Sequence, residues 1–130
     1  MATDNPSTDK PRLRAGHVLS EVARAWHTTV EALILPGRPH DLTTARHAAA
    51  VLLRELLGLS YPRIGYLLDR DHSTIVVAAK RWPARVAAHW WLDSRMRYVR
   101  GRLVDQFEIV PYPRARSGRP RSGAGYSRAA

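Results

Sequence analysis

Residues 60–82, SYPRIGYLLDRDHSTIVVAAKRW, decide the fold of this chain. Ser60 is a typical residue before the first turn of a helix, and the proline two positions later fits that turn because its missing N–H would have no partner there. Asp71 is a second residue of this kind, and we expect the helix that it opens to run to about Trp82, where Pro83 ends or kinks it. A short helix, a tight turn and a second helix with small polar residues at its start form a helix-turn-helix.

The start of the second helix carries the residues that such a motif presents to DNA. The second helix of a helix-turn-helix lies in the major groove with its first residues at the base edges, and here these are His72, Ser73 and Thr74. Small hydroxyl side chains allow a close approach, and they can hydrogen-bond to bases while a threonine methyl touches a thymine methyl. The spacing alone leaves an ordinary helical hairpin open as an alternative.

The rest of the chain has helical periodicity nearly throughout and no sustained alternation typical of strands. We therefore predict an all-α fold, a small helical bundle that contains the helix-turn-helix. Further helices are expected over residues 16–27, 30–35, about 43–57 and 93–107.

The expected helices carry capping residues at their ends. Thr28 with Glu31 resembles a capping box for the second helix, and Thr43 or Thr44 can cap the third. Gly58 stands where the third helix needs a C-terminal cap.

Composition divides the chain into one domain and two tails. Residues 16–109 form the predicted domain. Residues 1–15 are polar and contain prolines, while residues 110–130 combine Pro, Gly, Ser and Arg with almost nothing to bury. Such compositions favour a disordered N-terminal arm and a disordered basic tail.

Charge indicates the class of partner. The chain has 130 residues with 21 basic and 11 acidic side chains, a net charge of +10. About half of this excess lies in the C-terminal tail. The balance favours a polyanion, nucleic acid first. Because no apolar run could span a membrane and no signal region opens the chain, we expect a cytoplasmic, nucleoid-associated protein without membrane contact.

Chemistry beyond binding is not expected. The absence of cysteine excludes a disulfide scaffold, a thiolate nucleophile and Cys-ligated zinc, and the histidines lack the spacing of metal ligands. The sequence has no catalytic triad, no paired carboxylates and no Gly-x-x-x-x-Gly-Lys-(Ser/Thr) loop. We predict no enzyme activity, no cofactor and no metal.

Three motifs in residues 43–82 resemble the C-terminal DNA-binding domain of the bacterial replication initiators of the DnaA family. That domain has an Arg-led helix, then Ser-x-Pro-x-Ile-Gly, then Arg-Asp-His-(Ser/Thr)-Thr. Here Arg46, residues 60–65 and residues 70–74 stand in that order, and the similarity extends over about residues 17–108.

The resemblance implies a role in DNA binding for a set of residues. Residues 71–74 would contact bases of a DnaA-box-like site, and Arg38 would enter the minor groove. Ser60 and its two successors would hold phosphates at a helix N-terminus, where free N–H groups attract anions. The implied DNA-contacting residues are Arg38, Arg46, His47, Arg54, Ser60, Tyr61, Pro62, Arg70, Asp71, His72, Ser73, Thr74, Lys80 and Arg81.

The functional hypothesis is a sequence-specific binder of double-stranded DNA. It would regulate transcription or replication by occupying sites, without the ATPase module of the family, because only 15 residues precede the first expected helix. One alternative is the targeting subunit of a mobile element or of a phage replication system. Another is a protein-interaction adaptor that uses Trp90, Trp91 and the C-terminal arginines to bind a protein partner.

The four tryptophans have separate expectations. Trp26 and Trp82 are expected in the core. Trp90 and Trp91 could form a stacking platform for single strands. Adjacent helical residues point about 100° apart, however, so at most one of them would be buried, and we expect packing against the last helix instead.

Overall fold

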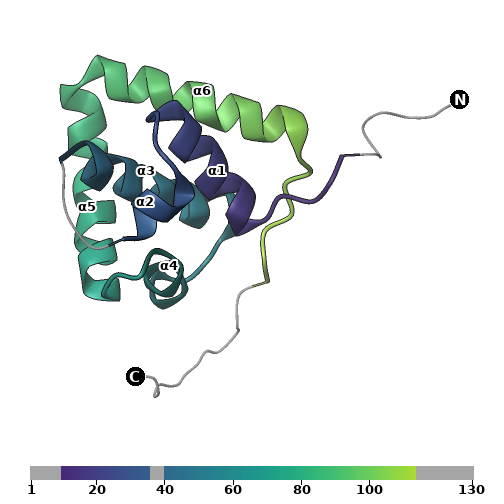
Figure 1. Ribbon diagram of the computed structural model, residues 1–130, viewed down its shortest axis with the longest axis horizontal. Helices are drawn as coiled ribbons and strands as arrows, with labels where there is room; N and C mark the ends of the chain where they lie inside the picture. The colour runs from purple at the N-terminus through teal and green to yellow at the C-terminus, as the bar shows by residue number, and fades with distance from the viewer. Residues whose placement is uncertain (1–9, 36–39, 114–130) are drawn as a thin grey trace, which may run out of the picture.

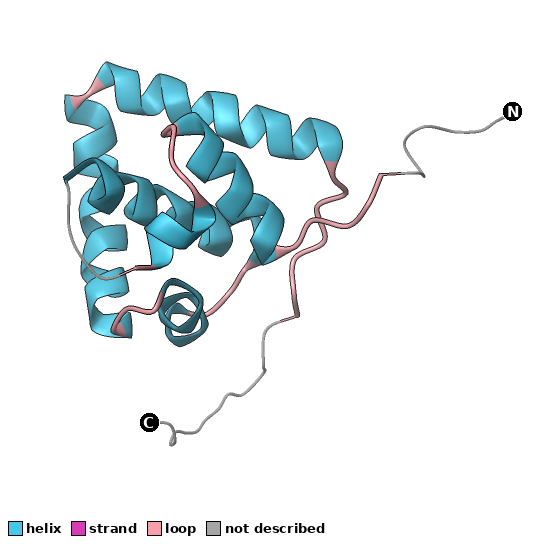
Figure 2. Cartoon of the chain, viewed as in Figure 1, coloured by secondary structure: helices cyan, strands magenta, loops and turns pink. Residues whose placement is uncertain are grey.

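The computed structural model describes residues 10–35 and 40–113, and this part of the chain is built from α-helices (Figure 1). It contains no strand, as Figure 2 shows, which confirms the predicted all-α bundle. In Figure 1, α6 crosses the top of the molecule, α5 descends along the left side and α4 lies at the bottom. The helices are α1 (Ala15–Ala25), α2 (Val30–Ile34), α3 (His40–Leu57), α4 (Tyr61–Leu68), α5 (His72–Ala88) and α6 (Trp90–Gln106).

The core forms around α3, which contacts α1, α2, α4 and α5. One side of α3 consists of small side chains, because Ala45, Ala48 and Ala49 are completely buried. Alanine at these positions lets the neighbouring helices approach closely. Trp26 and Trp82 are 9% and 6% exposed, which confirms that both belong to the core.

The geometry of α4 and of the turn to α5 explains why serine and glycine stand at positions 60 and 65 of the helix-turn-helix. Ser60 accepts a hydrogen bond from the Arg63 N–H at 3.3 Å, which confirms the predicted cap. Asp69 ends α4 in the left-handed conformation with φ of 56°. A Cβ atom on Gly65 would lie 2.5 Å from the carbonyl oxygen of Arg70, closer than real contacts allow. Only glycine therefore lets the start of α5 fold back onto α4.

Of the two predicted effects of Pro83, an end or a kink, the end is wrong, because α5 continues past the proline to Ala88. Val86, beyond the proline, packs partly buried against the core and prolongs the apolar side of α5. Tertiary packing thus outweighs the backbone hydrogen bond that proline cannot donate. After His89 the chain re-enters a helix at Trp90, three residues before the predicted start.

The starts of two other helices also differ from the prediction. The cap of α2 is Thr29, not Thr28, and its hydroxyl accepts from the Ala32 N–H at 3.1 Å. Thr43 and Thr44 lie inside α3 and do not cap it. Gly58 follows α3 with φ of 67°, in agreement with its predicted role.

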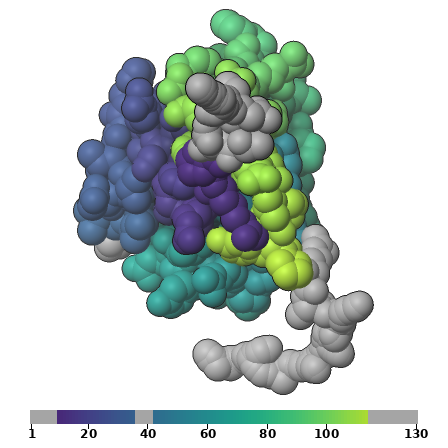
Figure 3. All heavy atoms as spheres, turned by 90° about the vertical axis from the view of Figure 1, so that its right-hand side faces the viewer, coloured from purple at the N-terminus to yellow at the C-terminus, as the bar shows by residue number. Residues whose placement is uncertain are grey.

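The two ends of the domain pair with each other (Figure 3). The Leu13 N–H donates to the Glu108 carbonyl at 2.8 Å, and the Leu13 side chain is completely buried. Leu13, a residue of the predicted N-terminal arm, therefore packs with the domain. At the other end the Tyr112 N–H donates to the Leu57 carbonyl at 2.9 Å, so residues after 109 also pack.

The remaining parts of both predicted tails, residues 1–9 and 114–130, lie outside the described residues, as does Arg38 within residues 36–39. In the described helices we find no segment that is long and apolar enough to cross a membrane.

Candidate nucleic-acid interface

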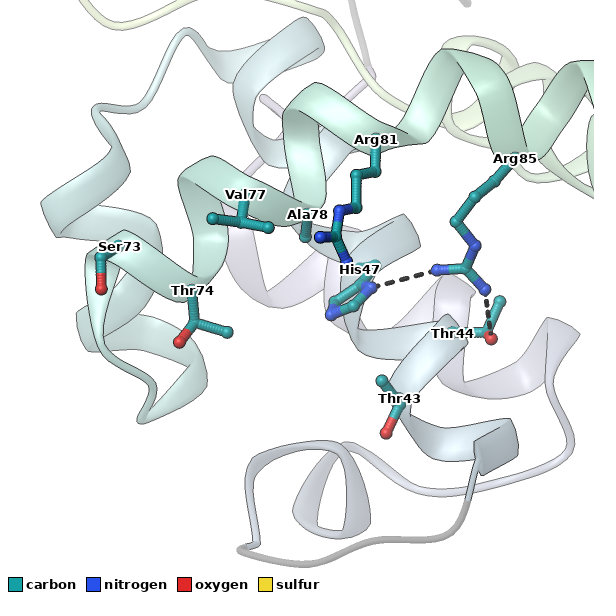
Figure 4. A pocket seen from close by; sticks show the side chains of 9 residues that line it. All are labelled: Thr43, Thr44, His47, Ser73, Thr74, Val77, Ala78, Arg81 and Arg85. Carbon is teal, nitrogen blue, oxygen red and sulfur yellow. Dashed lines mark hydrogen bonds between the residues drawn. The ribbon is translucent and has the colours of Figure 1, made fainter.

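A groove of about 570 Å³ lies between the start of α3 and the length of α5 (Figure 4). We call it the recognition groove. Two cations line it and no acid does, so its electrostatic character suits a nucleic acid. Its lining residues are Thr43, Thr44 and His47 from α3 and Ser73, Thr74, Val77, Ala78, Arg81 and Arg85 from α5.

The predicted base-contacting residues lie together at the first turn of α5. Ser73 and Thr74 are exposed and line the recognition groove. Asp71 occupies the N-cap position, but its carboxylate accepts a hydrogen bond from the Ser73 hydroxyl at 2.6 Å instead of capping the backbone. This bond lowers the pKa of Asp71, so the carboxylate is an ionised acceptor. His72 is exposed beside it, with Nδ1 at 3.8 Å from an Asp71 oxygen.

Arg85 crosses the recognition groove and holds two residues of α3 (Figure 4). It donates to the Thr44 hydroxyl at 2.8 Å, and its second terminal nitrogen lies 3.1 Å from His47 Nδ1. Burial, followed by the charges of Arg85 and then Arg46, lowers the pKa of His47 to about 4. A guanidinium only donates, so neutral His47 accepts through Nδ1 and carries its proton on Nε2. His47 is therefore a fixed N–H donor in the groove.

Sequence reasoning missed Arg85 because Pro83 was expected to end or kink the helix before it. The signal was present in the helical spacing, since Thr74, Ala78, Arg81 and Arg85 recur every three or four residues on one side of α5. Val77, which is 46% exposed, was missed as well.

Arg46 and Arg70, both implied as DNA contacts, are directed at the protein backbone. Arg46 is 4% exposed and its Nε donates to the Leu33 carbonyl at 2.7 Å. Arg70 donates to the carbonyls of Ile34 at 3.2 Å and Leu35 at 2.9 Å. Both guanidinium groups satisfy carbonyl groups at the C-terminal end of α2, where intrahelical partners are missing. In the described structure both guanidinium groups therefore hold the backbone at the end of α2, and their contact with DNA stays a prediction.

A second groove lies at the N-terminus of α4, and we call it the α4 groove. Its lining includes Arg54, Ser60 and Arg63 and no acid. The Arg54 guanidinium stacks over the Tyr61 ring at 4.4 Å and donates to the Leu59 carbonyl at 3.0 Å. Free N–H groups of a helix N-terminus together with two arginines suit a phosphate.

The remaining implied contacts, Pro62, Lys80 and Arg81, lie on α4 and α5. Pro62 is exposed in the first turn of α4, next to the α4 groove. Arg81 lines the recognition groove, whereas Lys80 is exposed on α5 outside it. In the described part of the chain, no group of three His, Asp or Glu side chains could hold a metal ion.

These side chains form a polar surface with the hydrogen-bonding groups and positive charges that duplex recognition needs. Hydroxyl, carboxylate and imidazole groups at the start of α5 and on α3 can exchange hydrogen bonds with base edges. The arginines around them suit phosphates, which fix the position of a protein on DNA without specifying sequence.

Comparison with known proteins agrees with this geometry. The family described as bacterial dnaA protein helix-turn-helix matches residues 16–81, half of the chain. The chain belongs to this DnaA helix-turn-helix family. The match contains the first turn of α5 and the α3 side of the recognition groove, and it ends before Arg85.

One relative is the chromosomal replication initiator protein DnaA of Mycobacteroides abscessus. It is 38% identical over 76 residues, which are 58% of this chain. The aligned part is 16% of that relative, so the chain corresponds to a small part of an initiator. The similarity concerns the DnaA helix-turn-helix, a DNA-binding domain.

Proposed function

We propose that this protein binds a DnaA-box-like site in double-stranded DNA and regulates transcription or replication by occupying that site. The observation that carries the proposal is the recognition groove, in which Ser73 and Thr74 are exposed beside the His47 donor and two arginines. The major groove of B-DNA is about 12 Å wide and accepts an α-helix. The first turn of α5 is the part of the motif that would meet the bases.

The α4 groove supports a defined placement on the duplex. In this proposal Arg54 and Arg63 hold a phosphate at the N-terminus of α4 while α5 enters the major groove. Contacts of this kind provide most of the affinity and the register, and base contacts provide the specificity.

The proposed mode of regulation is occupancy of the site. They include no Gly-x-x-x-x-Gly-Lys-(Ser/Thr) loop, so nucleotide hydrolysis is not part of the proposal. The similarity to a replication initiator supports a shared class of binding site. The proposed protein would compete for such sites or recruit a partner to them.

The test is binding of the full chain to a DnaA-box duplex and to a scrambled duplex at one salt concentration. We expect a clear preference for the box. Replacing Ser73 and Thr74 by alanine should remove that preference, because each good base contact contributes about 1–3 kcal/mol of discrimination. Ser20→Ala, an exposed hydroxyl on α1, is the matched control and should keep it.

Two results would contradict the proposal. The wild-type chain could bind both duplexes equally, which would leave only electrostatic attachment. Alternatively, the double variant could retain full selectivity with an unchanged circular dichroism spectrum, which would place the base contacts elsewhere.

A further inference from the structure

A group of exposed aromatic side chains lies on α6, a helix that does not line the recognition groove. Trp90 is 79% exposed, Tyr98 is 60% exposed and Trp91 is 40% exposed. The expectation that the two tryptophans pack against the last helix was wrong, because both belong to the first turn of that helix. Leu92 is the buried residue of this turn. Exposed tryptophan and tyrosine in one place are typical of an interaction surface.

These side chains border a shallow groove of about 460 Å³ between the end of α1 and the first half of α6. We call it the α1/α6 groove. Two arginines, Arg24 and Arg95, contribute positive charge, His27 lies beside them, and no acidic residue lines the groove. Within the described ranges, 10–35 and 40–113, neither Arg24 nor Arg95 forms an ion pair. An occupant would therefore carry negative charge.

The aromatic rings hold Arg95 in place. Its guanidinium carbon lies 5.0 Å from the centre of the Trp26 ring and 5.6 Å from that of Trp91. Trp26 is a core residue, so this stacking fixes the guanidinium on a rigid support. A stacked guanidinium keeps its N–H edges available, and these match a carboxylate in a bidentate arrangement.

The same contacts distinguish between two kinds of anionic occupant. Single-stranded DNA needs open ring faces on which bases stack. Here Arg95 lies over Trp91, and Arg102 lies 5.9 Å over Tyr98, so guanidinium groups already occupy a face of two of the three rings. A peptide needs only ring edges, a hydrophobic anchor and fixed cations. The observations therefore favour a peptide.

We propose that the α1/α6 groove binds an acidic segment of a partner protein. Carboxylates of the segment pair with Arg24 and Arg95, and one of its apolar side chains packs on Trp90. Tryptophan and arginine are the residues that most often dominate the affinity of protein interfaces. Since the recognition groove is built from α3 and α5, the protein can hold a duplex and the partner together.

The test is a selection of random 12-residue peptides, displayed on phage, against the full chain. Selected peptides are then synthesised with a fluorescent label, and their affinities are measured by anisotropy. We expect peptides with net negative charge and at least one large apolar residue. Trp90→Ala and Arg95→Glu should each weaken them at least tenfold, while Arg97→Glu should not, because Arg97 lies on the same helix outside the groove and pairs with Asp93. Duplex binding should be unchanged in Trp90→Ala.

Three outcomes would overturn the inference. One is a selection that yields no peptide whose binding depends on both Trp90 and Arg95. Another is a set of selected peptides without acidic bias. The third is binding of labelled oligothymidine that Trp90→Ala abolishes while it leaves the peptides bound, which would make the groove a site for single strands. Failure of the duplex preference would leave this test intact, since its readout is peptide affinity.

Discussion

Replacing Arg85 by methionine tests the arrangement that makes His47 a fixed donor. The change removes the hydrogen bond to Nδ1 and one of the two positive charges that lower the pKa of His47. Burial of the ring is the largest cause and remains. We therefore expect the pKa to rise above its wild-type value of about 4 and to stay below the ordinary 6.5.

The lowered pKa of His47 makes the free energy of unfolding depend on pH in a definite direction. In the unfolded chain His47 binds a proton near pH 6.5, but in the folded chain only near pH 4. Between these values the unfolded state holds more protons, so the free energy of unfolding falls as the pH falls. The full difference corresponds to about 3 kcal/mol at 1.36 kcal/mol per pH unit. Because the ring is only half-buried and solvent screens the charges, we expect about 1–2 kcal/mol.

Two measurements check this reasoning. Nuclear magnetic resonance of the His47 ring during a pH titration gives the pKa, and its nitrogen shifts show which nitrogen carries the proton. Urea unfolding at pH 7 and pH 4 gives the stability difference, and the His47→Gln variant provides the background from all other groups. The wild-type difference should exceed that of the variant by the expected amount, and Arg85→Met should lie between them.

The reasoning would be refuted by a proton on Nδ1 of neutral His47 in the wild type. It would equally be refuted by a pKa that Arg85→Met leaves unchanged. In either case Arg85 does not hold the imidazole, and the donor in the recognition groove would have to be reassigned.

Three further changes have expected outcomes. Residues 114–130 contain five arginines and no acid. Deleting them should make the slope of log affinity against log salt shallower by about 2–4, at about 0.9 for each lost phosphate contact. The preference for the box should survive, and loss of that preference would place specificity in the tail. Gly65→Ala should destabilise the protein by about 1–3 kcal/mol through overpacking at the Arg70 carbonyl. Gly101 is an open position in α6, and Gly101→Ala should stabilise the protein by about 0.5–1 kcal/mol. Thermal unfolding measures both effects. Arg70→Met should cost about 0.5–1.5 kcal/mol, because it removes the hydrogen bonds to the carbonyl groups of Ile34 and Leu35. Urea unfolding that matches the wild type would contradict this.

The features predicted correctly from the sequence depend on short-range chemistry. Ser60 caps α4 and Gly58 closes α3 because the side chain and the backbone angles at one position decide these structures. The helix-turn-helix follows from such signals placed close together along the chain. Periodicity was sufficient for the all-α fold for the same reason.

The features that were missed depend on long-range packing. An arginine has the same donors whether it faces a phosphate or a carbonyl, and Arg46 reaches a carbonyl 13 residues away in the sequence. Leu13 is a single apolar residue among polar ones, and its side chain is buried in the core while its backbone pairs with the distant Glu108. Pro83 remained inside a helix because Val86 packs on the core. None of these partners is adjacent along the chain.

Arg46 and Arg70 together hold the carbonyl groups of residues 33–35, immediately before position 36. The polypeptide therefore leaves α2 from an anchored point and returns in α3, the central helix of the core. The end of α2 is thereby joined to α3 through Arg46 and to the turn before Asp71 through Arg70. A substitution at the end of α2 should accordingly be felt on both sides of the recognition groove, because α3 and α5 line it.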